Sequence, residues 1–185
     1  MVIDEILAYN EQFVQENRLP IIGHTPRKRM AVVTCMDCRL VQMFELALGL
    51  ERGDVIELRT AGATISEPER EGGLTDLIRS LAGGIYLLGV REVAVIGHTQ
   101  CGLARADPNV LIASMQALGV DPQPLIEKAG PQSWIGAFDD VHVHVKEIVN
   151  VIHTSPYLPK IPVHGLVIDI ETGKLELVDK GNGAS

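Results

Sequence analysis

Three short, mostly apolar runs stand out along the chain, at residues 30–35, 55–59 and 93–97. They are rich in Val and Ile. An apolar run of this length is typical of a strand that is buried on both faces of a parallel sheet. We therefore expect three parallel strands at these positions.

Other segments repeat apolar residues at helical spacing. One such stripe runs through residues 74–88 and another through residues 138–152. Helices that alternate with buried strands indicate an α/β domain with a mainly parallel central sheet flanked by helices. Gly83 and Gly84 inside the first stripe each lower helix stability by roughly 1 kcal/mol relative to Ala. Their presence therefore predicts a close approach there by another element, in this chain or across a dimer interface.

The C-terminal part predicts a hairpin. Residues 163–170 and 174–178 are the expected strands, and residues 171–173 the connection, with Gly173 in its left-handed position. This hairpin adds an antiparallel edge strand to the sheet.

The N-terminal part predicts a helix at residues 3–17, followed by a loop that contains Pro20 and Pro26. Its apolar stripe must cover something. If the core is already closed, a second subunit supplies that surface. We therefore expect one domain over residues 1–185, with residues 1–28 as a helical arm that packs on a partner.

Composition narrows the classes of function. The 185 residues carry a net charge of −8 and contain no basic run, which argues against nucleic acid as a partner. No apolar stretch approaches the ~20 residues that span a bilayer. The first five residues include two acids and no basic residue, unlike a secretory signal. Three cysteines are too few for a disulfide framework, so we expect a cytoplasmic protein.

Two polar clusters follow the predicted strands directly. The first runs from Cys35 to Arg39, and the second from His98 to Gly102. Ligand sites in parallel sheets form beyond the carboxyl ends of the strands. The two clusters can therefore meet, although they are far apart along the chain.

Their meeting would join two thiolates and one imidazole, from Cys35, His98 and Cys101. This is a zinc ligand set, and three protein ligands leave the fourth position to water, as in catalytic sites. Zinc makes hydroxide available near neutral pH. Because two thiolates cancel the formal charge of the ion, its water should be less acidic here than at a site of three histidines.

Asp37 and Arg39 lie beside the first predicted ligand. An arginine can grip a carboxylate through two parallel hydrogen bonds, which would fix Asp37 and keep it ionised. Asp37 could then accept a hydrogen bond from the zinc-bound hydroxide. If the pair broke, Asp37 could itself take the fourth zinc position and close the site, and the sequence permits both states.

Several other residues are alternatives for the site. Cys38 could replace Cys35 as a ligand, but the two clusters supply three ligands without it. Thiol redox chemistry at Cys35 and Cys38 would leave His98 and Cys101 without a role. Asp76 is either a helix-surface acid or a pocket residue. We interpret the remaining histidines as structural or surface residues, with a proton shuttle as the alternative for one of them: His24, His142, His144, His153 and His164. Glycines at two positions are expected to serve backbone geometry near the site, namely Gly62 and Gly102.

The sequence resembles the β-class carbonic anhydrases, most closely their short bacterial and archaeal branch, from about residue 3 to residue 180. The likeness rests on Cys35-x-Asp37-x-Arg39, on residues 59–62, on residues 97–102 and on residues 163–175. It implies one zinc ion per chain on Cys35, His98 and Cys101, with Asp37 and Arg39 as the catalytic dyad. It also implies reversible hydration of carbon dioxide to bicarbonate and a proton, and a homodimer or an assembly of dimers.

One departure from the family is that Thr60 stands where many members carry Asn. Relatives of this scaffold hydrolyse carbonyl sulfide or carbon disulfide, so these reactions are the first alternative. A non-catalytic zinc-binding dimerisation module is the second, and it predicts that Asp37 fills the fourth zinc position at every pH.

Overall fold

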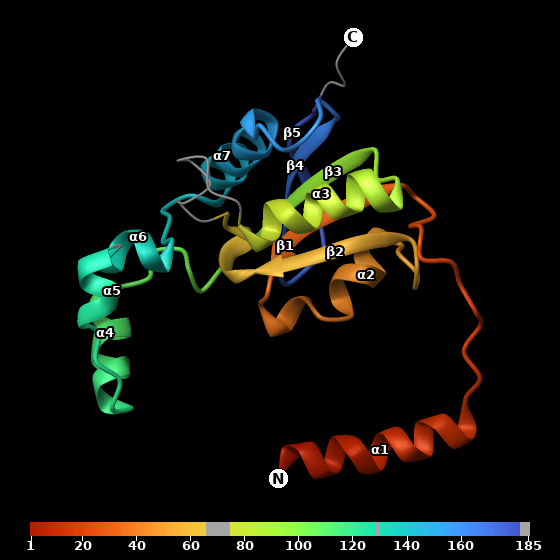
Figure 1. The fold of residues 1–185 in the computed structure, drawn as a ribbon, viewed down its shortest axis with the longest axis horizontal. Coiled ribbons are helices and arrows are strands. Elements are labelled where there is room, and N and C mark those ends of the chain that lie inside the picture. The colour runs from red at the N-terminus through yellow and green to blue at the C-terminus, as the bar shows by residue number, and fades with distance from the viewer. Residues whose placement is uncertain (66–74, 129, 182–185) are drawn as a thin grey trace.

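A five-stranded sheet forms the centre of the computed structural model, which describes residues 1–65, 75–128 and 130–181 (Figure 1). The strand order is β2-β1-β3-β4-β5. The first four strands are parallel, and β5 runs antiparallel to β4 at the edge. This confirms the predicted fold class. The strands are β1 (Met30–Cys35), β2 (Val55–Thr60), β3 (Glu92–His98), β4 (Val163–Ile168) and β5 (Leu175–Asp179).

Two layers of apolar side chains cover the sheet because successive residues of a strand point to opposite faces. Val33 and Val95 belong to the cluster under α3 and α7, whereas Val32 and Ile96 belong to the cluster that includes Phe44 of α2. The helices are α1 (Val2–Glu16), α2 (Met43–Leu48), α3 (Asp76–Leu88), α4 (Pro108–Ala117), α5 (Gln123–Lys128), α6 (Pro131–Ile135) and α7 (Val141–Thr154). Two short 3₁₀ turns complete the elements, η1 (Cys38–Leu40) and η2 (Ala61–Ala63).

One helix begins later than predicted. α7 begins at Val141 rather than at residue 138, because the Asp140 side chain caps it by accepting hydrogen bonds from the N–H groups of the next residues. α3 begins at Asp76. The start predicted for it, residue 74, lies outside the described residues.

The hairpin is present, but its connection is longer than predicted. β4 ends at Ile168 and β5 begins at Leu175. The Asp169 carboxylate accepts hydrogen bonds from two backbone N–H groups of the connection, which form a turn between the two strands. Gly173 has the expected left-handed backbone, with φ at 71°.

Glycines let α7 lie close to the sheet. A Cβ atom at Gly97 would stand 2.7 Å from a methyl carbon of Val141 and 2.8 Å from one of Val145. Within α3, a Cβ atom at Gly84 would lie 3.2 Å from Ile56, whereas Gly83 faces open space. Within this chain, the close approach predicted for the glycine pair therefore holds at Gly84 alone.

The N-terminal helix stands apart from the body of the chain (Figure 1). No residue of α1 is buried, and the side chains of its apolar stripe are more than half exposed at Ile3, Ile6, Leu7 and Val14. Among the described residues, no helix combines the length and apolar character needed to cross a membrane.

Because α7 lies close to the sheet, a methyl group added at residue 97 should destabilise the fold. We expect Gly97→Ala to lower the free energy of unfolding by about 1–3 kcal/mol, the usual range for overpacking. The matched control is Gly83→Ala, which adds a methyl group in open space on a helix and should raise stability by about 0.5–1 kcal/mol. Urea unfolding at one protein concentration measures both variants. Equal effects at the two sites would contradict this account of the interface.

Candidate metal centre

The carboxyl ends of β1 and β3 bring the predicted ligands together. Cys35 is the last residue of β1 and His98 the last of β3, and the two strands are parallel neighbours. Cys101 follows in the turn after β3. The sulfur and nitrogen ligand atoms of the three residues lie within 4.8 Å of one another, and all three side chains are buried.

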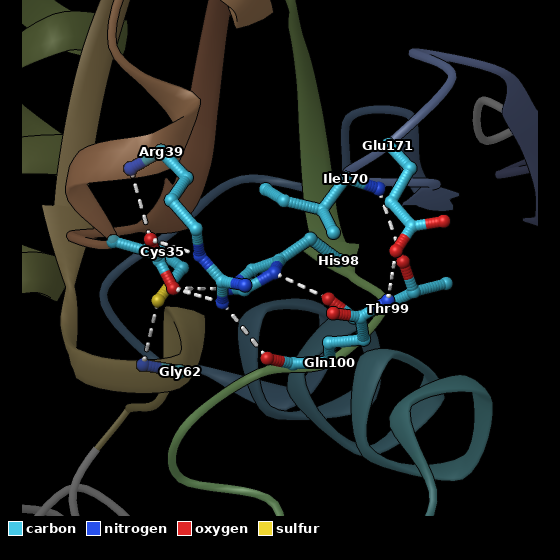
Figure 2. A network of polar contacts seen from close by, with 9 residues as sticks. Cys35, Arg39, Gly62, His98, Thr99, Gln100, Ile170 and Glu171 are labelled. Atoms are coloured by element: carbon cyan, nitrogen blue, oxygen red, sulfur yellow. Dashed lines mark hydrogen bonds and ion pairs between the residues drawn. The ribbon is translucent and has the colours of Figure 1, made fainter.

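The imidazole of His98 is oriented as a ligand. Its Nδ1 lies 2.8 Å from the carbonyl oxygen of Thr99 (Figure 2). A carbonyl oxygen can only accept, so the proton sits on Nδ1 and the lone pair on Nε2. Within the described residues, that buried Nε2 has no hydrogen-bond partner. An orphaned buried nitrogen beside two sulfur atoms fits a metal ion.

The surroundings of Cys35 favour the thiolate form of its side chain. The contact with Cys101, then those with His98 and the N–H groups of Asp37 and Gly62, lower the pKa of Cys35 to about 4. The same contact, together with burial, raises the pKa of Cys101. Metal and proton compete for this sulfur. The donor set of two sulfurs and one imidazole fits zinc.

Asp37 and Arg39 form the two-point pair that the sequence predicts. The Nε and Nη2 atoms of Arg39 donate to the two carboxylate oxygens at 3.0 and 2.7 Å, and Nη2 also donates to the carbonyl oxygen of Gln100 at 2.9 Å (Figure 2). The guanidinium holds the pKa of Asp37 at about 2. Asp37 Oδ2 lies 3.8 Å from His98 Nε2. The carboxylate is therefore ionised, beside the ligand set, and engaged with arginine.

Contacts that the sequence did not reveal fix the turn after β3. Thr99 Oγ1 accepts a hydrogen bond from the N–H of Ile170 at 3.0 Å, and Gln100 Nε2 donates to Glu171 at 2.8 Å. Ile170 and Glu171 lie in the connection between β4 and β5. No spacing or motif signals these long-range pairs, because they depend on how the hairpin folds beside β3.

The other candidate residues lie outside the ligand group. Cys38 is exposed in η1, and the side chain of Asp76 is 99% exposed at the start of α3, at the rim of a cavity beside α6. Open space at Gly102 shows no need for glycine there. Gly62, in contrast, has φ at 65° and donates its N–H to Cys35 Sγ at 3.3 Å.

The histidines fall into two groups. His142 and His164 pair with glutamates at the surface, His24 is exposed and His153 is partly exposed. His144, two residues from His142 on α7, points to the opposite side and is buried.

Comparison with known proteins agrees with this geometry. A family model described as carbonic anhydrase matches residues 30–175. A β-carbonic anhydrase of known structure from Trichomonas vaginalis is 35% identical, with a TM-score of 0.89 over 97% of this chain and 98% of that chain. Beta-carbonic anhydrase 1 of Mycobacterium tuberculosis is 32% identical over 96% of this chain and 98% of its own length. A carbon disulfide hydrolase of Acidithiobacillus thiooxidans is 26% identical over 83% of this chain and 79% of its own length.

The grouping of the predicted ligands and the form of the sheet agree with these matches. The most similar of the matches cover nearly the whole chain. The protein therefore belongs to the β-carbonic anhydrases, the zinc enzymes that interconvert carbon dioxide and bicarbonate.

Proposed function

We propose that Cys35, His98 and Cys101 hold one zinc ion, and that Asp37 and Arg39 are the residues that carry carbon dioxide hydration at it. The observation that supports this most directly is the buried Nε2 lone pair of His98, which faces two sulfur atoms. When bound, the ion would lower the pKa of a water molecule, so that the water gives up a proton near neutral pH and leaves the hydroxide that hydrates carbon dioxide.

Asp37 orients the attacking water in this proposal. Its carboxylate is ionised and can only accept hydrogen bonds, so it fixes the direction in which the water presents its proton. Arg39 keeps the carboxylate from turning toward the metal, because both carboxylate oxygens are engaged by the guanidinium. The carbonyl oxygen of Gln100 in turn anchors Arg39. This pairing favours an open fourth position over a filled, non-catalytic site.

The ligand roles predict a clear separation between metal binding and rate. Cys35→Ser and His98→Ala should lose both zinc and activity, because each removes one of three ligands. Asp37→Asn should keep most of its zinc and lose about 100-fold or more in rate, the usual effect of removing a positioned proton acceptor. Metal analysis and stopped-flow hydration of carbon dioxide measure the two properties.

Cys38→Ser is the control, since Cys38 is an exposed cysteine three residues from Cys35. It should keep both zinc and rate. A fully active Asp37→Asn enzyme would refute the role of that carboxylate. Sulfide release from carbonyl sulfide or carbon disulfide, with negligible hydration of carbon dioxide, would assign the site to those substrates instead.

Arg39 is expected to decide whether the site is open. Arg39→Met frees a carboxylate whose oxygen lies 3.8 Å from the metal-facing nitrogen of His98, so Asp37 should become the fourth ligand. The variant should keep its zinc, lose its activity, and, when substituted with cobalt, show a spectrum that no longer responds to added anions. A variant that still binds anions at the metal would contradict this function of Arg39.

We further propose that the enzyme is a homodimer or an assembly of dimers, in which the arm of residues 1–28 packs on the partner. An apolar groove of about 430 Å³ lies on the sheet face that α2 covers in part, lined by Met30, Val32, Ala94, Ile96, Leu166, Leu175 and Leu177 with neighbours that include Lys28 and His164. The helix α1 has an exposed apolar stripe of matching character. It also carries four acids and no basic residue, at Asp4, Glu5, Glu11 and Glu16. The matching apolar character therefore favours α1 of a second copy in this groove.

The apolar stripe of α1 can be tested without touching the body of the protein. Ile6→Asp places a charge within the stripe and should shift the protein toward monomers in sedimentation velocity experiments. Ala8→Asp adds the same charge on the polar side of the helix and should leave the assembly unchanged. If Ile6→Asp and Ala8→Asp both sediment like the parent protein, this mode of assembly is wrong.

The free cysteines favour a reducing compartment. All three are unpaired, and two of them belong to the proposed ligand set, which requires reduced sulfur. We therefore propose that the enzyme works in the cytoplasm.

A further inference from the structure

His144 is a polar residue in an otherwise apolar helix face. The other buried residues of α7 are Val145, Ile148, Val149 and Ile152, and the histidine is 6% exposed among them. A buried imidazole requires hydrogen-bond partners. Its Nε2 lies 3.1 Å from the carbonyl oxygen of Gly62 and 3.2 Å from Thr64 Oγ1. Because the carbonyl can only accept, Nε2 carries a proton and donates to Gly62.

The acceptor belongs to a turn that needs support. Gly62 and Ala63 in η2 both have positive φ, at 65° and 56°. An alanine in the left-handed region costs roughly 1–2 kcal/mol, so the surroundings must hold the turn in this shape. The hydrogen bond from His144 does this at the carbonyl of Gly62, and the hydroxyl of Thr60 does it at the carbonyl of Thr64.

The turn at Gly62 also contacts the proposed metal centre. The N–H of Gly62 donates to Cys35 Sγ, and the carbonyl of the same residue receives the hydrogen bond from His144. One residue therefore joins the imidazole in α7 to the sulfur at the end of β1.

A ring stack joins His144 to the segment of a second ligand. The Phe138 and His144 rings lie parallel, with centroids 4.1 Å apart and planes 6° apart. The carbonyl of Phe138 accepts a hydrogen bond from Arg105, in the loop that begins at Cys101. The phenyl ring also lies against Gly62, where a Cβ atom would meet it at 3.1 Å.

We propose that His144 is a positioning residue for the metal centre, which holds the N–H of Gly62 on the Cys35 sulfur through the carbonyl of the same glycine. The proposal rests on Cys35 being a zinc ligand, as proposed above. The N–H hydrogen bond stabilises the thiolate form of Cys35 against the proton that competes with the metal, and it also draws charge from the sulfur. Outer hydrogen bonds of this kind typically change metal affinity by 10- to 100-fold.

Replacements at residue 144 separate this role from packing. A glutamine amide reaches the place of Nε2, whereas an asparagine amide is one carbon too short to reach the Gly62 carbonyl. His144→Phe keeps the stack on Phe138 and removes the donor. His142→Phe makes the same exchange at an exposed position of the same helix.

We expect His144→Asn and His144→Phe to bind zinc about 10- to 100-fold more weakly in competition with a chelator, and His144→Gln to stay within about threefold of the parent protein. In the cobalt-substituted proteins, the thiolate-to-metal charge-transfer band should move to lower energy in the first two variants, because a sulfur without its hydrogen bond is more easily oxidised. A purely structural role would lower stability without moving this band.

Two outcomes would overturn the proposal. One is a His144→Phe protein with unchanged zinc affinity and band position. If that variant does not fold, the second outcome applies: equal zinc affinities in the His144→Asn and His144→Gln variants would also refute the proposal. Cys35→Ser, measured beside them, keeps the two proposals apart. If Cys35→Ser retains zinc, the ligand assignment fails. If Cys35→Ser loses zinc while the His144 variants bind it as tightly as the parent protein, only the role of His144 is refuted.

Discussion

The parallel pairing of β1 with β3 is the constraint on which the centre depends. Both strands are buried on both faces, so their register is fixed by packing above and below the sheet. That register leaves Cys35 and His98 at the same edge, where the strands end and side chains leave the core. A ligand set assembled in this way needs no flexible loop to bring its first two members together. It inherits the rigidity of the sheet.

Residues around this edge fix both the charged carboxylate and the sulfur of the centre. Arg39 and the Gln100 carbonyl hold the Asp37 carboxylate in one orientation, while the turn at Gly62 holds an N–H on the sulfur. Each contact comes from a different element. The chain thereby surrounds the proposed ion with groups that cannot move independently of the fold, as electrostatic preorganisation requires.

Much of this could be predicted from the sequence, because apolar runs and helical stripes report burial directly. The three strands, the two main helices, the edge hairpin and the grouping of Cys35, His98 and Cys101 follow from such patterns and from the rule on strand ends. The length of the hairpin connection could not be predicted, since it depends on hydrogen bonds of Asp169. The sequence predicts a structural or surface role for His144, and nothing in the local pattern points to its contact with Gly62, which lies 82 positions away.

The attachment of Thr99 and Gln100 to Ile170 and Glu171 has a consequence for how the enzyme matures. All three proposed ligands leave the ribosome long before the hairpin that steadies the segment between His98 and Cys101. Until that hairpin docks, the segment lacks two of the hydrogen bonds that hold it in place. Its final geometry therefore requires the complete sheet edge at β4 and β5.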